Sequence, residues 1–149
     1  MSRKLLCLVL GVVVCGCVGP FSEDLESHYA DVGAARREGA FDRGWLPEIV
    51  PDEATDIWEM HNIDTNLTWA CFSTPHGSAS TLALLQKQNA TRVSGPISNG
   101  PGGHFGTRKW WPSSMADTQI EAYQLKENSR FTLLIGIEAA ARRVCIHRS

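Results

Sequence analysis

The stretch FTLLIGIEAAARRVCIH, residues 131–147, decides the fold class that the sequence predicts. Its first seven residues, 131–137, are almost continuously apolar, which is typical of a central strand whose two faces are both covered. Residues 138–142 are predicted to make a turn, and RVCIH at 143–147 is predicted to form a closing edge strand. The C-terminal end of the chain therefore belongs to a sheet.

Further strands are predicted upstream of this pair. Residues 54–63 have apolar members at strand spacing, and TWACFS at 68–73 is rich in β-forming residues. The segment 64–66, Asp-Thr-Asn, is turn chemistry, so these two runs indicate a hairpin or a closely spaced strand pair. Residues 118–125 alternate apolar and polar side chains, which predicts one more strand.

Two segments have helical spacing instead. In residues 23–38, Leu25, Tyr29 and Val32 would lie on one helical face, and acidic residues at the start would suit the helix dipole. Residues 78–89 form the second predicted helix. The sequence thus predicts an α+β fold of order α-β-β-α-β-β-β: a mostly antiparallel sheet of about five strands, with both helices on one face.

The remaining segments are predicted to be irregular. RGWLPEIVP at 43–51 contains two prolines, which exclude regular structure, yet it is too apolar for a free linker. We expect it to plug one end of the core. Residues 94–106 are rich in Gly, Pro, Ser and Asn and are predicted to form a loop. No Gly-Lys-Ser/Thr follows NGPGGHFG at 99–106, so a phosphate-binding loop is not indicated.

The N-terminus has the pattern of an export signal. A basic pair precedes an apolar run of about ten residues, which is too short to span a bilayer. Val-Cys-Gly-Cys at 14–17 resembles the lipobox of bacterial lipoprotein signal peptides. That resemblance implies cleavage after residue 16 and lipid attachment to Cys17. Residues 17–22 would then form a tether, and the length of the chain that follows predicts a single domain over residues 23–149.

Composition and charge fit a small globular domain. The chain has 149 residues, 43% hydrophobic and 20% charged, with a formal net charge of −2. Without residues 1–16, 12 basic residues face 16 acidic ones, which gives −4. The nine basic residues of the C-terminal part, 65–149, are spaced rather than clustered, so nucleic acid is not an expected partner.

Two cysteines remain in the predicted mature domain once Cys17 carries lipid. Cys71 and Cys145 form an even pair in an exported chain, where disulfides persist. A bridge between them would close a loop of about 75 residues, worth roughly 3–4 kcal/mol through chain entropy. Two buried free thiols, or a reactive Cys71, are the alternatives.

The densest polar group surrounds His61. On a strand, Glu59 and His61 would share a face, with Asp64 at the strand end. A carboxylate beside a histidine suits general-base chemistry, and the same groups could ligate zinc. No HExxH spacing is present, however, so a strand end closed by side-chain turns is the alternative. We assign no metal and no cofactor from the sequence.

A second candidate site contains aromatic residues. Trp110 and Trp111 stand between Lys109 and Pro112 and could form a stacking platform for glycans, with His104 as an accessible ligand-binding side chain. Exposed aromatic residues are costly without a partner. The alternative is that at least one of the two tryptophans packs in the core.

One pattern resembles a known group of proteins. RGWLP at 43–47, Pro51 and HNIDTN at 61–66 look like segments shared by a group of small uncharacterised bacterial lipoproteins. The resemblance covers roughly residues 28–73. It implies an envelope location and a small α+β domain, and it implies no activity.

The function expected from the sequence is that of a lipid-anchored bacterial envelope protein, binding or scaffolding without catalysis. An envelope hydrolase using His61 and a glycan-binding module are the alternatives. Val18 after Cys17 resembles the sorting pattern for the outer membrane, facing the periplasm. Expected partners are the membrane, through the lipid, and peptidoglycan or another envelope protein.

Overall fold

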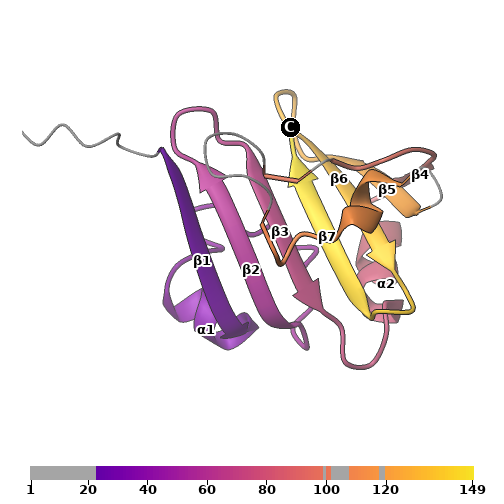
Figure 1. Ribbon diagram of the computed structural model, residues 1–149, viewed down its shortest axis with the longest axis horizontal. Helices are drawn as coiled ribbons and strands as arrows, with labels where there is room; N and C mark the ends of the chain where they lie inside the picture. The colour runs from indigo at the N-terminus through magenta and orange to yellow at the C-terminus, as the bar shows by residue number, and fades with distance from the viewer. Residues whose placement is uncertain (1–22, 99, 102–107, 118–119) are drawn as a thin grey trace, which may run out of the picture.

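One antiparallel sheet of seven strands dominates the computed structural model, which describes residues 23–98, 100–101, 108–117 and 120–149 (Figure 1). In these residues the spatial order is β1-β2-β3-β7-β6-β5-β4. The bounds are β1 Asp24–Asp31, β2 Thr55–Asn62, β3 Thr68–Ser73, β4 Thr91–Val93, β5 Glu121–Lys126, β6 Thr132–Glu138 and β7 Arg143–Arg148.

The sheet is built from two runs of consecutive strands. Strands β1, β2 and β3 lie side by side in chain order, and β4, β5, β6 and β7 form a second run that starts at the opposite edge (Figure 1). The two runs meet where β3 pairs with β7. The middle of the sheet is therefore formed by two strands, β3 and β7, whose paired residues are more than 70 positions apart in the sequence.

A disulfide bond crosses this central seam. Cys71 of β3 lies directly opposite Cys145 of β7 in the strand register, and the two sulfur atoms are bonded. The bond therefore links the two runs of strands at the β3–β7 pairing, where they meet.

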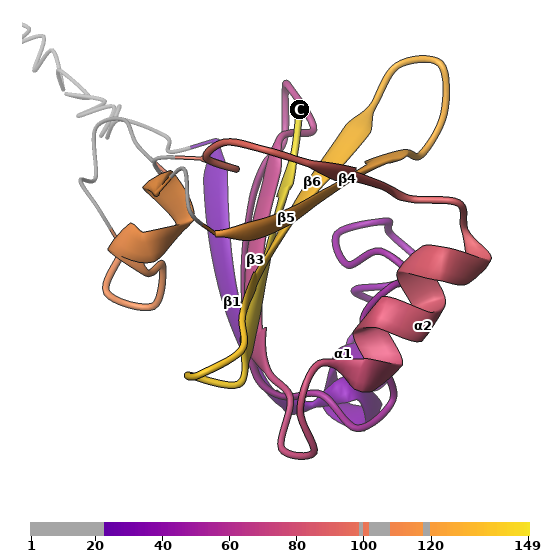
Figure 2. The ribbon, with the colours of Figure 1, turned by 90° about the vertical axis from the view of Figure 1, so that its right-hand side faces the viewer.

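Different segments cover the two faces of the sheet (Figure 2). Helices α1, Val32–Arg37, and α2, Ala79–Lys87, lie on one face, together with the proline-containing segment at 43–51. A short 3-10 helix, η1 at Ser113–Ala116, lies on the other face with the residues around it. Strands β3 and β7 consequently bury side chains on both faces, as central strands must.

The segment at 43–51 packs against the helix-side core, as the sequence predicts. Leu46 and Ile49 are each 1% exposed, and Val50 is buried beside them. Their burial follows from the two prolines, which prevent regular pairing and leave the apolar side chains to fill the space between helices and sheet.

Close packing also holds the segment on the opposite face, residues 108–117 with η1, which we call the covering segment. Gly136 of β6 faces η1, and a Cβ atom there would lie only 2.7 Å from the sulfur of Met115. Ile97 and Ile120 would be almost as close. Only a residue without a side chain lets the segment around η1 approach the sheet so closely.

The expected α+β class with about five strands is wrong: the fold is mostly β, with seven strands and two short helices. The largest error concerns residues 23–38, where the structure has β1 followed by the six-residue α1. Leu25 is 44% exposed, so its helical spacing with Tyr29 does not mark a buried face. Pairing of β1 with β2 along its whole length outweighs this local pattern.

Asp31 sets the point where β1 ends and α1 begins. Its side-chain Oδ1 accepts a hydrogen bond of 2.7 Å from the amide of Ala34, which caps the helix.

The three-residue strand β4, Thr91–Val93, was also not predicted, because it is too short to produce a pattern. Antiparallel pairing, the helix predicted at 78–89, and strands near the positions predicted for β2, β3, β5, β6 and β7 are confirmed. The edge position predicted for residues 143–147 is wrong: β7 lies in the middle of the sheet, because it pairs with β3 on one side and with β6 on the other.

Candidate functional site

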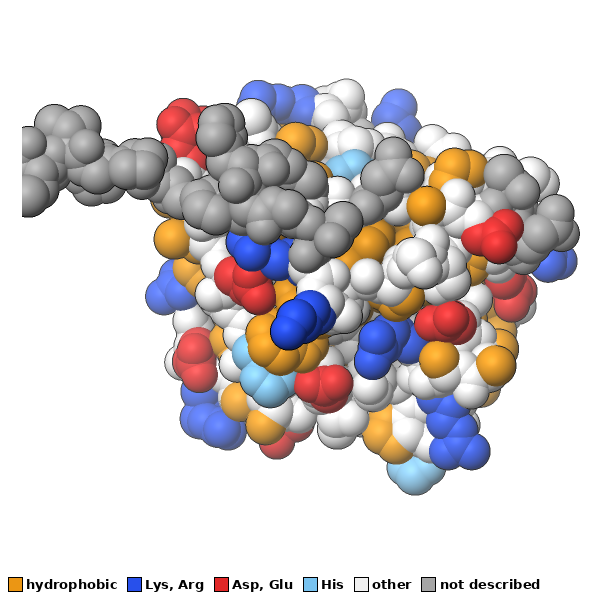
Figure 3. Space-filling model, in the orientation of Figure 1, with side chains coloured by type: hydrophobic (Ala, Val, Ile, Leu, Met, Phe, Trp, Pro, Cys, Tyr) orange, Lys and Arg blue, Asp and Glu red, His pale blue; other side chains and the backbone are white. Residues whose placement is uncertain are grey.

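A groove of about 610 Å³ opens on the face of the sheet opposite the helices. We call it the tryptophan groove; it is lined by Glu26, Trp58, Arg108, Lys109, Trp110 and Arg143. Its volume lies in the range of small-ligand sites. Figure 3 shows this face of the molecule, where basic and hydrophobic side chains lie next to one another.

A bulge in β2 orients Trp58, the half-buried tryptophan of the groove. The register between β2 and β3 shifts between Thr55 and Trp58, and Asp56 within it has a φ of 49°. The Asp56 carboxylate accepts hydrogen bonds from Trp58 Nε1 at 3.1 Å and from His28 Nε2 at 2.9 Å. The ring of His28 stacks on Trp58 with 4.1 Å between ring centres. Bulges of this kind commonly redirect a side chain beside a functional site.

Glu26 of β1 holds the opposite wall of the groove in place. One carboxylate oxygen accepts a hydrogen bond of 3.0 Å from Trp110 Nε1. The other lies 2.8 Å from Nε of Arg108. A single carboxylate therefore attaches the covering segment to the edge strand.

The two tryptophan rings of the groove are nearly parallel. The ring centres of Trp58 and Trp110 are 6.3 Å apart, with 13° between the ring planes. Trp111 meets Trp110 edge-on, at 73°. Trp110 and Trp111 are only 8% and 7% exposed, so the partly exposed ring next to them is that of Trp58. The glycan platform predicted for the Trp110–Trp111 pair stays a prediction, now with a third tryptophan.

The groove has an excess of positive charge. Arg108, Lys109 and Arg143 contribute three cationic groups against the one carboxylate of Glu26. Lys109 is exposed and Arg143 is half-buried. These two cations have no ion pair within the part of the chain that the structure describes.

The predicted Glu59–His61 pair lies on the other face of the sheet, beneath the segment at 43–51. His61 Nδ1 and Glu59 Oε1 are 2.8 Å apart, so the strand does bring the two side chains together. Glu59 is fully buried and His61 is 4% exposed. Trp45 stacks on the His61 ring with 4.1 Å between ring centres and covers it.

Burial sets the protonation state of this pair. It raises the pKa of Glu59 to about 8, an effect that the positive charge of Arg148 only partly offsets. Burial, helped by Arg43, lowers the pKa of His61. Both shifts favour the neutral form of each group, in which the Glu59 carboxyl group can donate a hydrogen bond to an unprotonated His61 Nδ1.

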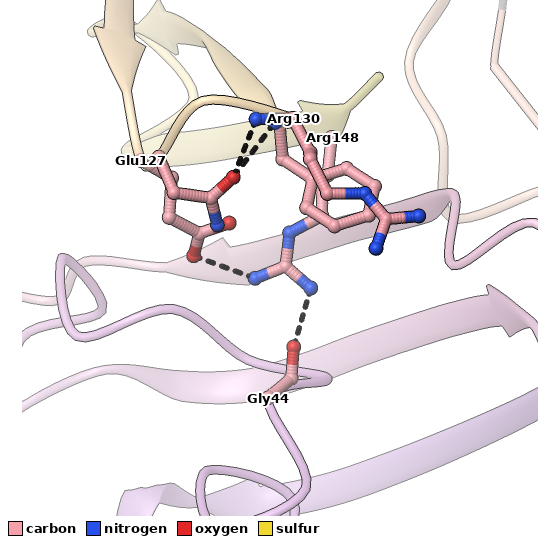
Figure 4. Close-up of polar contacts among 6 residues, drawn as sticks. Gly44, Glu127, Arg130 and Arg148 are labelled. Carbon is pink, nitrogen blue, oxygen red and sulfur yellow. Dashed lines mark hydrogen bonds and ion pairs between the residues drawn. The ribbon is translucent and has the colours of Figure 1, made fainter.

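Arg148 fixes the loop that covers this pair (Figure 4). One of its terminal nitrogens donates to the backbone carbonyl of Gly44, next to Trp45. The other lies 2.7 Å from Glu127 Oε1 and forms an ion pair with it. The end of β7 thus holds the Gly44–Trp45 turn over Glu59 and His61, which leaves a substrate no room beside them.

The other predicted site residues are dispersed. Asp64 is exposed in the turn after β2, separate from the buried pair. Cys17 and His104 lie outside the described residues. In the described ranges no group of histidine, cysteine and carboxylate side chains is arranged to hold a metal ion. No helix in these ranges has the length and hydropathy of a membrane-spanning segment.

Sequence reasoning missed Glu26, Trp58, Arg108 and Arg143 as site residues. Trp58 was assigned only to the apolar pattern of its strand, and Glu26 only to a helix dipole. The sequence contained one usable signal: on a strand, Trp58 alternates with Glu59 and must face the opposite side from the Glu59–His61 pair.

Comparisons with known proteins match one part of the chain. No curated protein and no solved structure matches it significantly. The matched part runs from β1 through β3 and includes Glu26 and Trp58 but not the groove wall at Arg108–Trp110. Residues 23–73 are similar to the YbbD head domain, a bacterial family.

Proposed function

We propose that this protein is a lipid-anchored bacterial envelope protein that binds a ligand in the tryptophan groove and performs no catalysis. The observation that carries the binding role is the groove itself, where Trp58 and Trp110 are each fixed by a carboxylate. The lipobox-like segment ending at Cys17 and the similarity to a bacterial family support the envelope location.

The side chains of the tryptophan groove are preorganised for binding. Asp56 and Glu26 hold the two indole groups through their ring nitrogens, and the covering segment packs tightly against Gly136. Binding to such a site loses little side-chain entropy, because the contact residues are already ordered. The sealed Glu59–His61 pair offers no comparable access, so we assign it a structural role.

The lipid anchor is tested by metabolic labelling with palmitate. We expect a Cys17→Ala variant to lose its label and to leave the outer-membrane fraction, because Cys17 is the proposed lipid-bearing residue. A Cys7→Ala variant is the matched control and should keep both, since Cys7 lies in the part of the signal that is removed. Full labelling of the Cys17→Ala variant would remove the anchor from the proposal.

The binding role is tested by retention of the mature protein on isolated cell-wall sacculi and outer-membrane vesicles. We expect Trp58→Ala to reduce retention about tenfold, which corresponds to a loss of roughly 1.4 kcal/mol. Trp69→Ala is the matched control, because Trp69 is also half-buried and stacks on a histidine, His147, outside the groove. Equal retention of both variants, or no retention of the unchanged protein on either material, would contradict the groove as the binding site.

A further inference from the structure

We infer that Leu25 and Ile63 contact the lipid surface to which the protein is anchored, so that the end of the domain at residue 23 lies on the membrane. The contact rests on the lipid anchor of the proposed function and adds to it a role for the folded domain. Three features support it: the exposure of the two side chains, their position on one face of the sheet, and the small number of residues between them and Cys17.

Leu25 and Ile63 are the two large hydrophobic side chains that stand exposed among the described residues. Leu25 is 44% exposed and Ile63 is 55% exposed, whereas the other large aliphatic and aromatic side chains of these ranges are buried or half-buried. Single exposed aliphatic side chains are common on protein surfaces, but neighbouring ones favour a partner of low polarity.

Both side chains lie on the helix side of the sheet, at the end where β1 begins and β2 ends (Figure 1). Leu25 lies directly opposite His61 in the strand register, and directly opposite residues of an antiparallel pair lie on the same face. Ile63 follows His61 by two positions, and its amide donates to the carbonyl of Glu23, so the pairing continues to it. Leu25 and Ile63 are therefore diagonal neighbours across the two strands.

The residues around this pair are of kinds that lie at membrane surfaces. Trp45 covers His61, and the guanidinium carbon of Arg43 lies 4.6 Å from the centre of the Trp45 ring. Tryptophan is enriched at membrane–water interfaces, and an arginine there can keep its charge in water while its stem packs on apolar groups. Glu23 and Asp64 are also exposed at this end, so a lipid surface without net negative charge is the expected partner.

The proposed anchor holds this end of the domain close to the membrane. Six positions separate Cys17 from residue 23, and a fully extended chain covers at most about 3.5 Å per position, so residue 23 lies within about 20 Å of the lipid-bearing residue. Such a short tether gives Leu25 and Ile63 a high effective concentration at the membrane, so that even a weak contact is populated. The lipid surface is therefore the partner that this geometry favours.

The test measures contact between the folded domain and lipid in the anchored protein. The mature lipoprotein is reconstituted into phosphatidylcholine vesicles that contain a lipid with a nitroxide near the top of its acyl chain, which quenches a fluorophore only at short range. The fluorophore is attached to the thiol of an Asp64→Cys variant, next to Ile63, or of a His76→Cys variant in the turn after β3, at the opposite end of the sheet. We expect quenching at position 64 to exceed quenching at position 76 at least threefold.

Polar substitutions assign the contact to the two side chains. We expect Leu25→Ser and Ile63→Ser each to reduce quenching at position 64, and the double variant to reduce it at least twofold, because both side chains are exposed and lose lipid contact rather than core packing. Leu84→Ser is the matched control, because Leu84 is a half-buried leucine of another element, α2. Phosphatidylglycerol added to the vesicles should not raise the quenching, since the expected contact is apolar and Glu23 beside it is acidic.

The outcomes separate this inference from the proposed function. Equal quenching at positions 64 and 76, unchanged quenching in the double variant, or quenching that requires phosphatidylglycerol would each overturn the lipid contact, while the palmitate label on the same samples leaves the anchor in place. A double variant that changes only from dimer to monomer in sedimentation would show that the two side chains join copies of the chain, and it would overturn the contact as well. Absence of the palmitate label from the mature protein would instead overturn the anchor of the proposed function.

Discussion

Removal of the Cys71–Cys145 bond is expected to lower the free energy of unfolding by about 4 kcal/mol, the largest change in stability that we predict. The bond joins residues 74 positions apart, so in the chain-entropy model its loss greatly expands the unfolded ensemble. It also crosses the pairing of β3 with β7, which in the residues that the structure describes is the one place where the two runs of strands meet. Urea unfolding of a Cys71→Ala/Cys145→Ala variant measures this loss.

The unchanged protein treated with a reducing agent is the matched control for this variant. It keeps both buried sulfur atoms and loses only the bond, so it separates the cross-link from the packing of the side chains. We expect the two samples to agree within about 1 kcal/mol, the usual cost of a small change in core volume. A reduced protein as stable as the oxidised one would contradict the prediction.

The second large effect concerns the pH dependence of stability. We expect Glu59→Gln to remove most of the stability loss that the unchanged protein shows between pH 6.5 and pH 8, about 2 kcal/mol in total. Glutamine keeps the shape of the side chain, and its amide can donate a hydrogen bond to His61 Nδ1. Because glutamine does not titrate, it binds no proton in either the folded or the unfolded state, and stability no longer depends on pH through residue 59. Urea unfolding at several pH values across this window measures the difference.

The sign follows from the direction of each pKa shift. Burial raises the pKa of Glu59 from 4.5 to about 8, so the folded protein keeps a proton that the unfolded chain loses, and stability falls as the pH rises toward 8. Burial lowers the pKa of His61 and of His147, so their contribution to stability is lost as the pH falls below about 6.5. The window above pH 6.5 therefore isolates Glu59.

A matched substitution elsewhere checks this assignment. Glu53 is a half-exposed carboxyl group whose pKa is lowered, chiefly by a hydrogen bond from Ser80, so it titrates below pH 4.5. Glu53→Gln should leave the loss of stability between pH 6.5 and 8 unchanged. Parallel pH curves for Glu59→Gln and the unchanged protein would show that Glu59 is ionised in the folded state.

The sequence predicted most strands because their signal is local. FTLLIGI and TWACFS consist mostly of apolar, β-branched and aromatic residues, and the structure has β6 and β3 there. Residues 23–38 failed because the spacing of Leu25, Tyr29 and Val32 suits a helix, whereas the pairing partner of this segment is more than 20 residues away in the chain. Local propensity contains no information about such a partner.

The two candidate sites differed in how far the sequence revealed them. Glu59 and His61 are two positions apart on one strand, so strand geometry alone places them on the same face. The tryptophan groove combines β1, β2, the 108–110 segment and β7, and its residues are separated by up to 117 positions. Such a combination arises only when the sheet forms.

The sequence by itself determined the positions of β2, β3, β5, β6 and β7, the turn at 64–66, the packed segment at 43–51 and the adjacency of Glu59 and His61, because each depends on neighbouring residues alone. The tertiary structure alone decided that residues 24–31 form an edge strand, that β3 pairs with β7, and that Glu26 attaches Trp110 beside Trp58. These depend on pairing between distant segments, whose free energy is gained only when both are buried together.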